Sequence, residues 1–479
     1  TIFHFLYYLC RWKTNNQLML KKFSYWTASL LFLWGTLLTS CFQDRSVEYY
    51  ALIQPKTWMY EVMQQYYLFY EDLPSEEDLN FFNKPQDFLK SVVSSQDQKN
   101  GVTFSHVDSV FTTSRATSET PTFGIEGAMV QVPSGAYAIR VLYIQPDSPA
   151  EEAGIHRGDW IISADNKKMK STDYTKYISN PTQAYTFTLG SYNGEEFDTI
   201  PQTVQMPAPR YIEEHNLLSQ KMLEIGGKKV AYLLYNEFGD QDEEALNQWF
   251  TDIASANPSD IILDLRYNPG GYLNMAQKLG SMLAPQSAQG QPFVKMTYND
   301  KLNQEEVLKV DPALIPGGTA LNYTNLYILT TSNTASASEV IINCLKPYLK
   351  ERLIQVGTAT FGKNIGQQLF TDEQAPQLEF WLTTIYLSNS EGFKDYFDNG
   401  LTPDYEQAED MSGTLGEFAS AEDALIQPVF THIQTGSFPV LPEEGEETLQ
   451  KSRGNSGTNI RILYNSIASK PHTAKNKLH

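Results

Sequence analysis

Cysteine is scarce in this chain of 479 residues, which contains only Cys10, Cys41 and Cys344. The first two lie in an N-terminal segment that is treated separately below, so Cys344 has no partner and no intramolecular disulfide is expected. Cys344 lies on the apolar face of a predicted helix, which favours a core thiol. The sequence has no HExxH or CxxC pattern, and its seven histidines are scattered. We therefore expect neither a metal site nor a cofactor.

Basic residues are also few, with 36 Lys and Arg against 56 Asp and Glu and a formal net charge of −20. Proteins that bind nucleic acid nonspecifically rely on Lys and Arg to neutralise phosphates. This charge balance argues against a nucleic-acid partner.

The N-terminus has the pattern of an export signal. Thr1 is not a start residue, whereas Met19 is followed by two lysines, an apolar run over residues 26–38 and Ser40-Cys41. A basic start, an apolar middle and small residues before a cut describe a signal peptide, and this ending resembles a bacterial lipobox. We expect residues 1–18 to be a gene-model extension and residues 19–40 to be a lipoprotein signal peptide. Two alternatives remain: an uncleaved membrane anchor, and a cytosolic protein with a chance apolar start.

Signal removal would leave Cys41 as the lipidated first residue. The membrane would then be a partner through this lipid. The expected location is the cell envelope, as a periplasmic or outer-membrane-anchored lipoprotein.

The remaining sequence divides into four parts of different character. Residues 41–117 have apolar residues at helical spacing and predict a small helical domain, and residues 118–206 are rich in predicted strands. Residues 207–440 alternate strands and helices, which is typical of an α/β core. Residues 441–479 are polar, with few large apolar residues, and are predicted to be disordered.

The β-rich part resembles a PDZ domain of the bacterial protease type. Its pattern is Phe123-Gly124-Ile125, a strand over residues 141–144, a Ser-Pro helix start at Ser148, and a Gly-Asp turn into a strand at Trp160. Such a domain captures an extended peptide by adding it to a sheet edge and holds the terminal carboxylate on backbone N–H groups. The resemblance makes Phe123, Gly124 and Ile125 the peptide-binding loop.

Residues 333–340, which contain Ser336, join a predicted buried strand to a predicted helix. Small residues there give access to a substrate backbone and leave N–H groups at a helix N-terminus, where negative charge is favoured. This position suits a nucleophilic serine. Ser336-x-x-Glu339 also fits a helix capping box, which needs no catalysis.

Four stretches in order resemble the carboxyl-terminal processing, or tail-specific, serine proteases. They are residues 264–271, 334–339, 360–367 and 400–404, and they follow the PDZ-like part. The resemblance spans about residues 120–410. It implies a mixed α/β (α+β) protease core with a preceding PDZ domain, here behind a small helical N-terminal segment.

By this resemblance Ser336 is the nucleophile, Lys363 the general base and Gln367 the residue that orients the lysine. A serine hydroxyl needs an adjacent base, and a lysine serves only if burial lowers its pKa towards neutrality. Gln368 leaves the choice of glutamine open. Asn364 departs from the usual glycine after the lysine, and the spacing from serine to lysine is slightly long.

The tetrahedral intermediate needs preorganised N–H donors for its oxyanion. The family pattern assigns these donors to Ala337 and to one of two glycines, Gly270 or Gly271, between which the sequence does not choose. Ser338 is the alternative nucleophile that the pattern argues against.

The sequence therefore predicts an exported, lipid-anchored serine endopeptidase that cleaves polypeptides near their C-termini by a Ser-Lys(-Gln) mechanism. Its PDZ domain would select substrates or gate access, and its partner would be a polypeptide substrate. The alternative is a catalytically inactive family member that only holds peptides. The oligomeric state does not follow from the sequence.

Overall fold

The structure is a computed structural model that describes residues 46–109, 118, 120–373, 375–440, 460–470 and 473–476. It divides into two compact units, residues 1–57 and 58–479. The first unit is described only from residue 46, where helix α2 (Ser46–Tyr66) begins. The predicted extension, the signal peptide and Cys41 lie outside the described residues.

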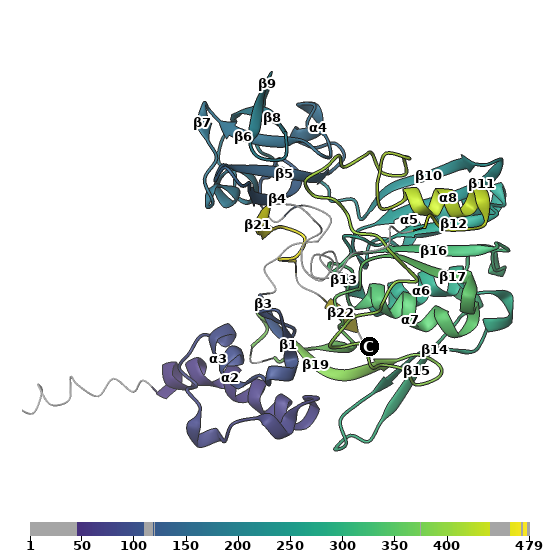
Figure 1. Cartoon of the computed structure of the whole chain (residues 1–479). Helices are drawn as coiled ribbons and strands as arrows, with labels where there is room; N and C mark the ends of the chain where they lie inside the picture. The colour runs from purple at the N-terminus through teal and green to yellow at the C-terminus, as the bar shows by residue number, and fades with distance from the viewer. Residues whose placement is uncertain are drawn as a thin grey trace, which may run out of the picture. The chain divides into compact units, whose positions relative to one another are not determined.

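The core of the second unit is a six-stranded sheet with the order β10-β11-β12-β16-β17-β20 (Figure 1). Neighbouring strands from β11 to β20 are parallel, and β10 is antiparallel to β11. The strands are β10 (Leu217–Ile225), β11 (Lys228–Tyr235), β12 (Asp260–Asp264), β16 (Asn325–Thr330), β17 (Leu353–Gly357) and β20 (Tyr405–Glu406).

Helices cover both faces of this sheet, which explains why its strands are almost continuously apolar. Alternate residues of β11 point to opposite faces. Ala231 and Leu233 pack in the cluster that contains residues of α5 (Glu243–Ala256), α6 (Leu273–Leu283) and α7 (Ala337–Leu349). Val230 and Tyr232 pack in the cluster that contains residues of α8 (Gln427–Thr435). This arrangement confirms the predicted mixed α/β core.

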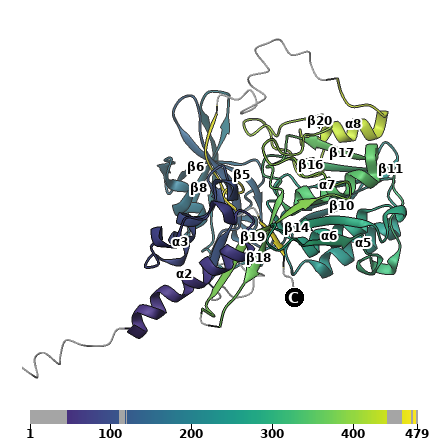
Figure 2. The ribbon, with the colours of Figure 1, turned by 90° about the horizontal axis from the view of Figure 1, so that it is seen from below.

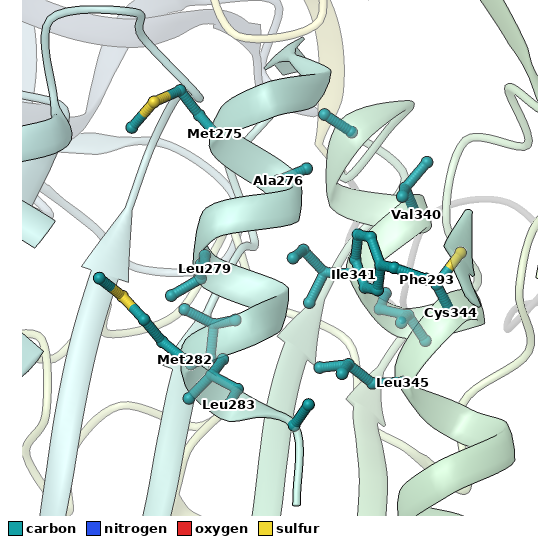
Figure 3. Close-up of a cluster of buried hydrophobic side chains, with 14 of the residues drawn as sticks. Met275, Ala276, Leu279, Met282, Leu283, Phe293, Val340, Ile341, Cys344 and Leu345 are labelled. Atoms are coloured by element: carbon teal, nitrogen blue, oxygen red, sulfur yellow. The ribbon is translucent and has the colours of Figure 1, made fainter. Parts of the chain in front are cut away.

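Helices α6 and α7 pack on each other beside the sheet (Figure 3). Met275, Leu279 and Leu283 of α6 belong to the same buried cluster as Ile341 and Leu345 of α7. Cys344 lies in this cluster as a buried free thiol, as the sequence predicts. This packing fixes the axis of α7, the helix that follows Ser336.

A second sheet runs in the order β13-β22-β18-β19-β14-β15, and β3 pairs with β19. Figure 2 shows β18 and β19 side by side. The strands are β3 (His106–Ser109), β13 (Gly270–Tyr272), β14 (Pro292–Thr297), β15 (Glu305–Lys309), β18 (Ile365–Phe370), β19 (Leu378–Ser388) and β22 (Thr473–Asn476).

The N-terminal part is less purely helical than expected. After α2 come α3 (Pro85–Val92) and the short hairpin of β1 (Gln98–Lys99) and β2 (Val102–Thr103), and β3 then joins β19 of the second sheet. Phe88 and Phe104 share a buried cluster with Phe361 and Ile365. Residues 58–109 therefore pack against the strand that follows Lys363.

The PDZ domain is built on the sheet β21-β4-β5-β6-β8-β9, with β7 paired to β6. Its elements are β4 (Ile125–Gln131), β5 (Tyr137–Ile144), α4 (Pro149–Glu152), β6 (Trp160–Ala164), β7 (Lys167–Lys168), β8 (Thr186–Tyr192) and β9 (Phe197–Gln205). Ser148 caps α4 by accepting a hydrogen bond from Glu151 N (3.2 Å), as its Ser-Pro signal indicates.

The outer strand of that sheet, β21 (Arg461–Asn465), comes from the segment that we expected to be disordered. Residues 473–476 form β22 in the second sheet. The expectation of disorder is therefore wrong for both stretches. The polar composition of these residues wrongly predicted disorder, because a strand that pairs through its main chain with an existing sheet does not require large apolar side chains. Ile467 is nevertheless fully buried.

No helix within the described ranges is both long enough and apolar enough to span a bilayer.

Candidate active site

Ser336 stands at the junction of β16 and α7 in an unusual backbone conformation. Its φ of 59° and ψ of −113° lie outside the regions that L-residues favour, which is a strain seen at functional positions. The serine is fully buried, and its Oγ has no hydrogen-bond partner among the described residues. Ser336 and Glu339 have the capping-box arrangement that the sequence suggests, with the Ser336 side chain towards the N–H of Glu339, but Ser336 Oγ makes no hydrogen bond of regular geometry there.

Glu339 connects the serine segment to the lysine segment. Its carboxylate accepts hydrogen bonds from the N–H groups of Ser336 (2.7 Å), Gly362 (2.6 Å) and Lys363 (2.7 Å) and from the hydroxyl of Thr360 (2.5 Å). Burial raises the pKa of Glu339, and these hydrogen bonds oppose the rise. The sequence suggested Glu339 only as a helix cap. Its second role, holding residues 360–363 beside Ser336, was missed.

Lys363 and Gln367 are both fully buried, and they contact each other. Lys363 Nζ donates to Gln367 Oε1 at 2.8 Å and lies 4.8 Å from the centre of the Phe104 ring. A shift in the β18–β19 register between Gly366 and Gln367 accompanies this orientation. The structure therefore brings the predicted base and its predicted orienting residue together.

Gln368 makes different contacts. It accepts a hydrogen bond from Thr384 Oγ1 (2.8 Å) and donates one to Tyr298 Oη (3.1 Å). The ambiguity between the two glutamines is thus resolved in favour of Gln367 as the partner of Lys363. Asn364, the departure from the family pattern, is not among the residues with positive φ, so its backbone does not require glycine.

Gln367 leads to a further buried carboxylate that no pattern in the sequence marks. Gln367 Nε2 donates to Thr383 Oγ1 (3.1 Å), and Thr383 Oγ1 donates to Asp97 Oδ1 (2.6 Å). Asp97 is fully buried, and burial raises its pKa to about 6. No local motif marks this contact, because the two residues are 286 positions apart.

The glycine turn lies against the serine segment. Ala335 N donates to Asn268 O at 3.0 Å, and Ser338 Oγ donates to the same oxygen at 3.2 Å. Ser338, the alternative nucleophile, is therefore occupied in holding the turn. Both glycines have positive φ, 116° for Gly270 and 137° for Gly271. A Cβ on Gly271 would lie 2.2 Å from Phe238 O, so only glycine fits there.

The two glycines differ in where their N–H groups point. Gly270 N already donates to Asn268 Oδ1 (2.9 Å). Phe238 N donates to Gly270 O and Tyr272 N donates to Phe238 O, both at 2.8 Å. Because backbone groups of successive extended residues point to opposite sides, Gly271 N–H points away from Phe238 and towards β22. Gly271 is therefore the glycine whose N–H faces the strand position between β13 and β18, which β22 occupies.

The predicted peptide-binding loop of the PDZ domain leads directly into β4. Phe123 is fully buried, and its carbonyl accepts from Ala150 N at 3.0 Å. Gly124 has a φ of +77°, and a Cβ there would lie 2.4 Å from Ser148 Cβ. Ile125 is the first residue of β4 and is also buried. The loop thus has the glycine conformation that its sequence indicates.

Among the described residues no three His, Cys, Asp or Glu side chains gather to hold a metal ion.

Comparison with known families gives three matches along the chain. Residues 229–407 match peptidase family S41, residues 54–106 match the peptidase S41 N-terminal domain, and residues 140–182 match the PDZ domain.

Individual relatives agree with these matches. A structure from Bacteroides fragilis, described as a "Putative S41 protease", is 32% identical with a TM-score of 0.69, over 79% of this chain and 97% of that one. A carboxyl-terminal-processing protease of a Picosynechococcus strain is 24% identical over 51% of this chain and 55% of its own length. One from a Synechocystis strain is 24% identical over 58% and 61%. The chain thus spans little more than half the length of these two relatives.

Proposed function

Because the chain belongs to peptidase family S41, we propose that it is a serine endopeptidase that processes polypeptides near their C-termini, with Ser336 as nucleophile and Lys363 as general base. The observation that carries the assignment is the buried contact between Lys363 Nζ and Gln367 Oε1, 2.8 Å long, on the segment that Glu339 fastens to Ser336. The acceptor is the neutral amide of Gln367, which orients the amine.

The reaction proceeds through an acyl-enzyme. Ser336 Oγ attacks the peptide carbonyl while its proton passes to neutral Lys363, and the resulting ammonium protonates the leaving amine. Water then attacks the ester, Lys363 accepts a proton from it, and the carboxylate product leaves as the serine regains its proton. Catalytic hydrogen bonds are often long or poorly aligned in resting enzymes and tighten only with substrate, which fits a Ser336 Oγ that has no partner within the described ranges.

The oxyanion would be stabilised by the N–H groups of Ala337 and Gly271. Ala337 is the first residue of α7, where the helix end favours negative charge. Gly271 is preferred over Gly270 because the N–H of Gly270 donates to Asn268. Loss of one such donor typically costs about 2.7–4 kcal/mol of transition-state stabilisation.

The decisive experiment compares a soluble form that starts at Gln43 with its Ser336→Ala variant on unfolded casein. The expected result is cleavage by the first and none by the second. Equal cleavage by both would contradict the assignment of Ser336. If the unaltered enzyme binds casein or several other unfolded substrates but cleaves none, the inactive peptide-binding alternative gains support.

We also propose that lipid on Cys41 anchors the protein in the cell envelope. The support is the sequence of residues 38–41 behind a basic and apolar leader. Incorporation of labelled palmitate in cells, and its loss in Cys41→Ala, is the expected result. Incorporation that persists in the variant would contradict the anchor.

A further inference from the structure

All three proposed catalytic side chains are closed off from solvent. Ser336, Lys363 and Gln367 each have a relative exposure of 0%. A polypeptide substrate cannot reach the serine hydroxyl until some covering part of the molecule moves.

The backbone of β22 occupies the strand position beside these residues. It pairs in parallel with β13, where Gly271 faces Ala474, and with β18, where Gln367 faces Lys475. An extended segment of the chain therefore lies between the strand whose Gly271 N–H points towards it and the strand that carries Gln367. A substrate held by main-chain hydrogen bonds would need the same place.

The preceding segment covers the peptide-binding edge of the PDZ domain. β21 adds antiparallel to β4, the strand that follows the Phe123–Ile125 loop, with Tyr464 opposite Met129 (Figure 1). PDZ domains bind extended peptides by strand addition of this kind. The Tyr464 ring also packs on the Tyr174 ring, with 4.6 Å between centroids.

The segment leaves this edge before it reaches the loop. The last backbone bond to β4 runs from Ser466 N to Gly127 O (3.0 Å), and Lys470 Nζ then pairs with Glu126 Oε1 (3.0 Å). The paired stretch therefore ends short of the Phe123-Gly124 turn. A chain that follows both the PDZ edge and the position beside Gln367 covers the two places where a polypeptide substrate would be held.

We propose that residues 460–470 and 473–476 are built-in peptide occupants of the substrate path, which a polypeptide substrate must displace from the β4 edge and from between β13 and β18. This inference rests on the proposed protease function and adds to it a route for the substrate. It makes the C-terminal segment of the chain the competitor of every substrate.

A reversible covalent lock tests the proposal. Gln131 and Arg461 face each other across the β4–β21 pair, and neither is buried. Facing residues of antiparallel strands have Cα atoms about 4.5–5.5 Å apart, within the range of a disulfide. Oxidised Gln131→Cys/Arg461→Cys protein should lose most of its casein cleavage, and dithiothreitol should restore it. Locked protein that cleaves at the unlocked rate would overturn the proposal.

A matched control uses the same chemistry away from the segment. Ser191 and Asp198 face each other across β8 and β9 and are both exposed. The oxidised Ser191→Cys/Asp198→Cys protein should cleave casein at the wild-type rate. If the control loses as much casein cleavage, the cause would be the rigidity of the PDZ sheet and not the locked segment. This result would also overturn the proposal.

Hydrogen exchange gives a readout that does not depend on cleavage or on a new disulfide. In Ser336→Ala protein, amides of residues 461–466 should be protected alone and should lose protection when saturating casein is bound. Unchanged protection in the casein complex would contradict displacement. Failure of the unaltered enzyme to cleave or bind casein would instead count against the proposed function.

A second inference comes from the hydrogen bonds behind Lys363. Three hydroxyls donate to the Asp97 carboxylate: Thr383 Oγ1 (2.6 Å), Tyr67 Oη (3.1 Å) and the Ser105 hydroxyl. Tyr67 Oη in turn accepts from Ser94 N (3.0 Å). This is the pattern expected around an ionised carboxylate, which can only accept.

That pattern determines which way the Gln367 amide faces. The Thr383 hydroxyl has a single proton, which goes to Asp97, so towards Gln367 it can only accept. Gln367 must then present Nε2 to Thr383 and Oε1 to Lys363. The direction of each hydrogen bond follows from the charge of Asp97.

The geometry points to Asp97 as a positioning residue for the proposed reaction: through Thr383 it fixes the amide orientation of Gln367 and thereby holds Lys363 in place. This role rests on the proposed function of Lys363. It would explain why a carboxylate from the N-terminal part is enclosed behind the active site.

Substitutions along this chain of hydrogen bonds test the role. Asp97→Asn and Thr383→Val should each lower kcat by about 10- to 100-fold, the range for loss of an outer hydrogen-bond partner, with little change in KM. Because both act through one chain, the double variant should be no slower than the slower single variant. Thr383→Ser, which keeps the hydroxyl, should restore kcat.

Thr384→Val is the matched control, since its hydroxyl donates to Gln368 rather than to Gln367. It should keep the wild-type kcat. A Thr383→Val enzyme with wild-type kcat, or additive losses in the double variant, would overturn the role of Asp97. If Asp97→Asn does not fold, the Thr383 pair of variants still decides. A wild-type enzyme that cleaves nothing would contradict the proposed function instead.

Discussion

Arg266, beside the glycine turn, and Lys363, beside the serine, are both fully buried cations with different surroundings. Arg266 contacts three carboxylates: Asp264 at 2.7 Å, Asp423 at 3.0 Å and Glu409 at 3.1 Å. Burial alone would lower the pKa of Arg266, but these carboxylates raise it well above its usual value. The arginine is therefore held permanently charged.

Lys363 Nζ instead donates to the neutral amide of Gln367 and lies over the Phe104 ring. Hydrogen bonds through Gln367 and Thr383 connect the amine to the Asp97 carboxylate, and Glu339 accepts from the backbone N–H of Lys363. A cation paired directly with carboxylates keeps its proton, whereas an amine that is oriented by an amide can release it. The comparison teaches that the contacts of Arg266 are suited to stabilising the fold, whereas those of Lys363 are suited to proton transfer.

The largest expected effect is on activity at the lysine. Lys363→Met keeps the length of the side chain and removes the amine, so kcat should fall by about 10²–10⁴-fold. Stability should fall less than in Arg266→Met, because the Lys363 amine donates to the Gln367 amide, whereas Arg266 contacts three carboxylates. Casein cleavage and urea unfolding check both parts. If Lys363→Met lowers the free energy of unfolding as much as Arg266→Met does, the distinction between the surroundings of Lys363 and those of Arg266 would be lost.

The matching change at the arginine should act on stability. Arg266→Met leaves Asp264 and Asp423 buried without their cation, and such a loss typically costs about 3–5 kcal/mol. Urea unfolding measures it. Lys346→Met is the control, because the Lys346–Asp404 pair is 41% and 44% exposed and should contribute less than about 1 kcal/mol. Equal effects of the two substitutions would contradict the structural role of the arginine network.

The two networks should also respond oppositely to pH. Burial raises the pKa of Asp97 from 3.8 to about 6, so its contribution to stability is present below pH 3.8 and is lost as pH rises through 6. Burial would also raise the pKa of Glu409, but Arg157 and Arg266 lower it from 4.5 to about 2. Its contribution is present above pH 4.5 and is lost as pH falls through 2.

Unfolding free energies at a series of pH values test this contrast. Asp97→Asn should gain stability relative to wild type as pH rises from 4 to 7, by about 3 kcal/mol. The deficit of Glu409→Gln should shrink as pH falls from about 4.5 towards 2. Parallel pH profiles for the two variants would contradict the account.

The parts of the site that lie in local sequence motifs could be predicted, whereas the parts that depend on distant contacts could not. Ser336, Lys363 and Gln367 lie in motifs that local patterns and a family resemblance mark, and the structure brings Lys363 and Gln367 together. The buried strand before Ser336 and the helix after it were also predicted, because apolar runs are local signals.

Other features depend on distant contacts that no local pattern records. Asp97 and Thr383 meet across 286 positions, and β21 pairs with a strand more than 300 residues earlier in the chain. The polar composition of residues 441–479 predicted disorder, but composition carries no information about sheet edges that are available for pairing. The choice between Gly270 and Gly271 required the Asn268 side chain to be located.

The smallest expected effect separates two neighbouring residues. Gln367→Ala removes the hydrogen-bond acceptor of Lys363 and should lower kcat about 10- to 100-fold. Loss of a hydrogen-bond partner that orients a metal ligand has an effect of this size in metalloenzymes. Gln368→Ala should leave kcat within about twofold, because Gln368 bonds to Thr384 and Tyr298 and not to Lys363. A reversed order would show that the wrong glutamine has been assigned.

The central claim is that Lys363 activates Ser336, and the rate of serine acylation by a fluorophosphonate probe measures this directly. Wild-type protein should be labelled on Ser336 at a rate that rises with pH as the lysine loses its proton. In Lys363→Met the labelling should be slow and should lack that rise. Labelling of Lys363→Met at the wild-type rate with the same pH dependence would contradict the claim.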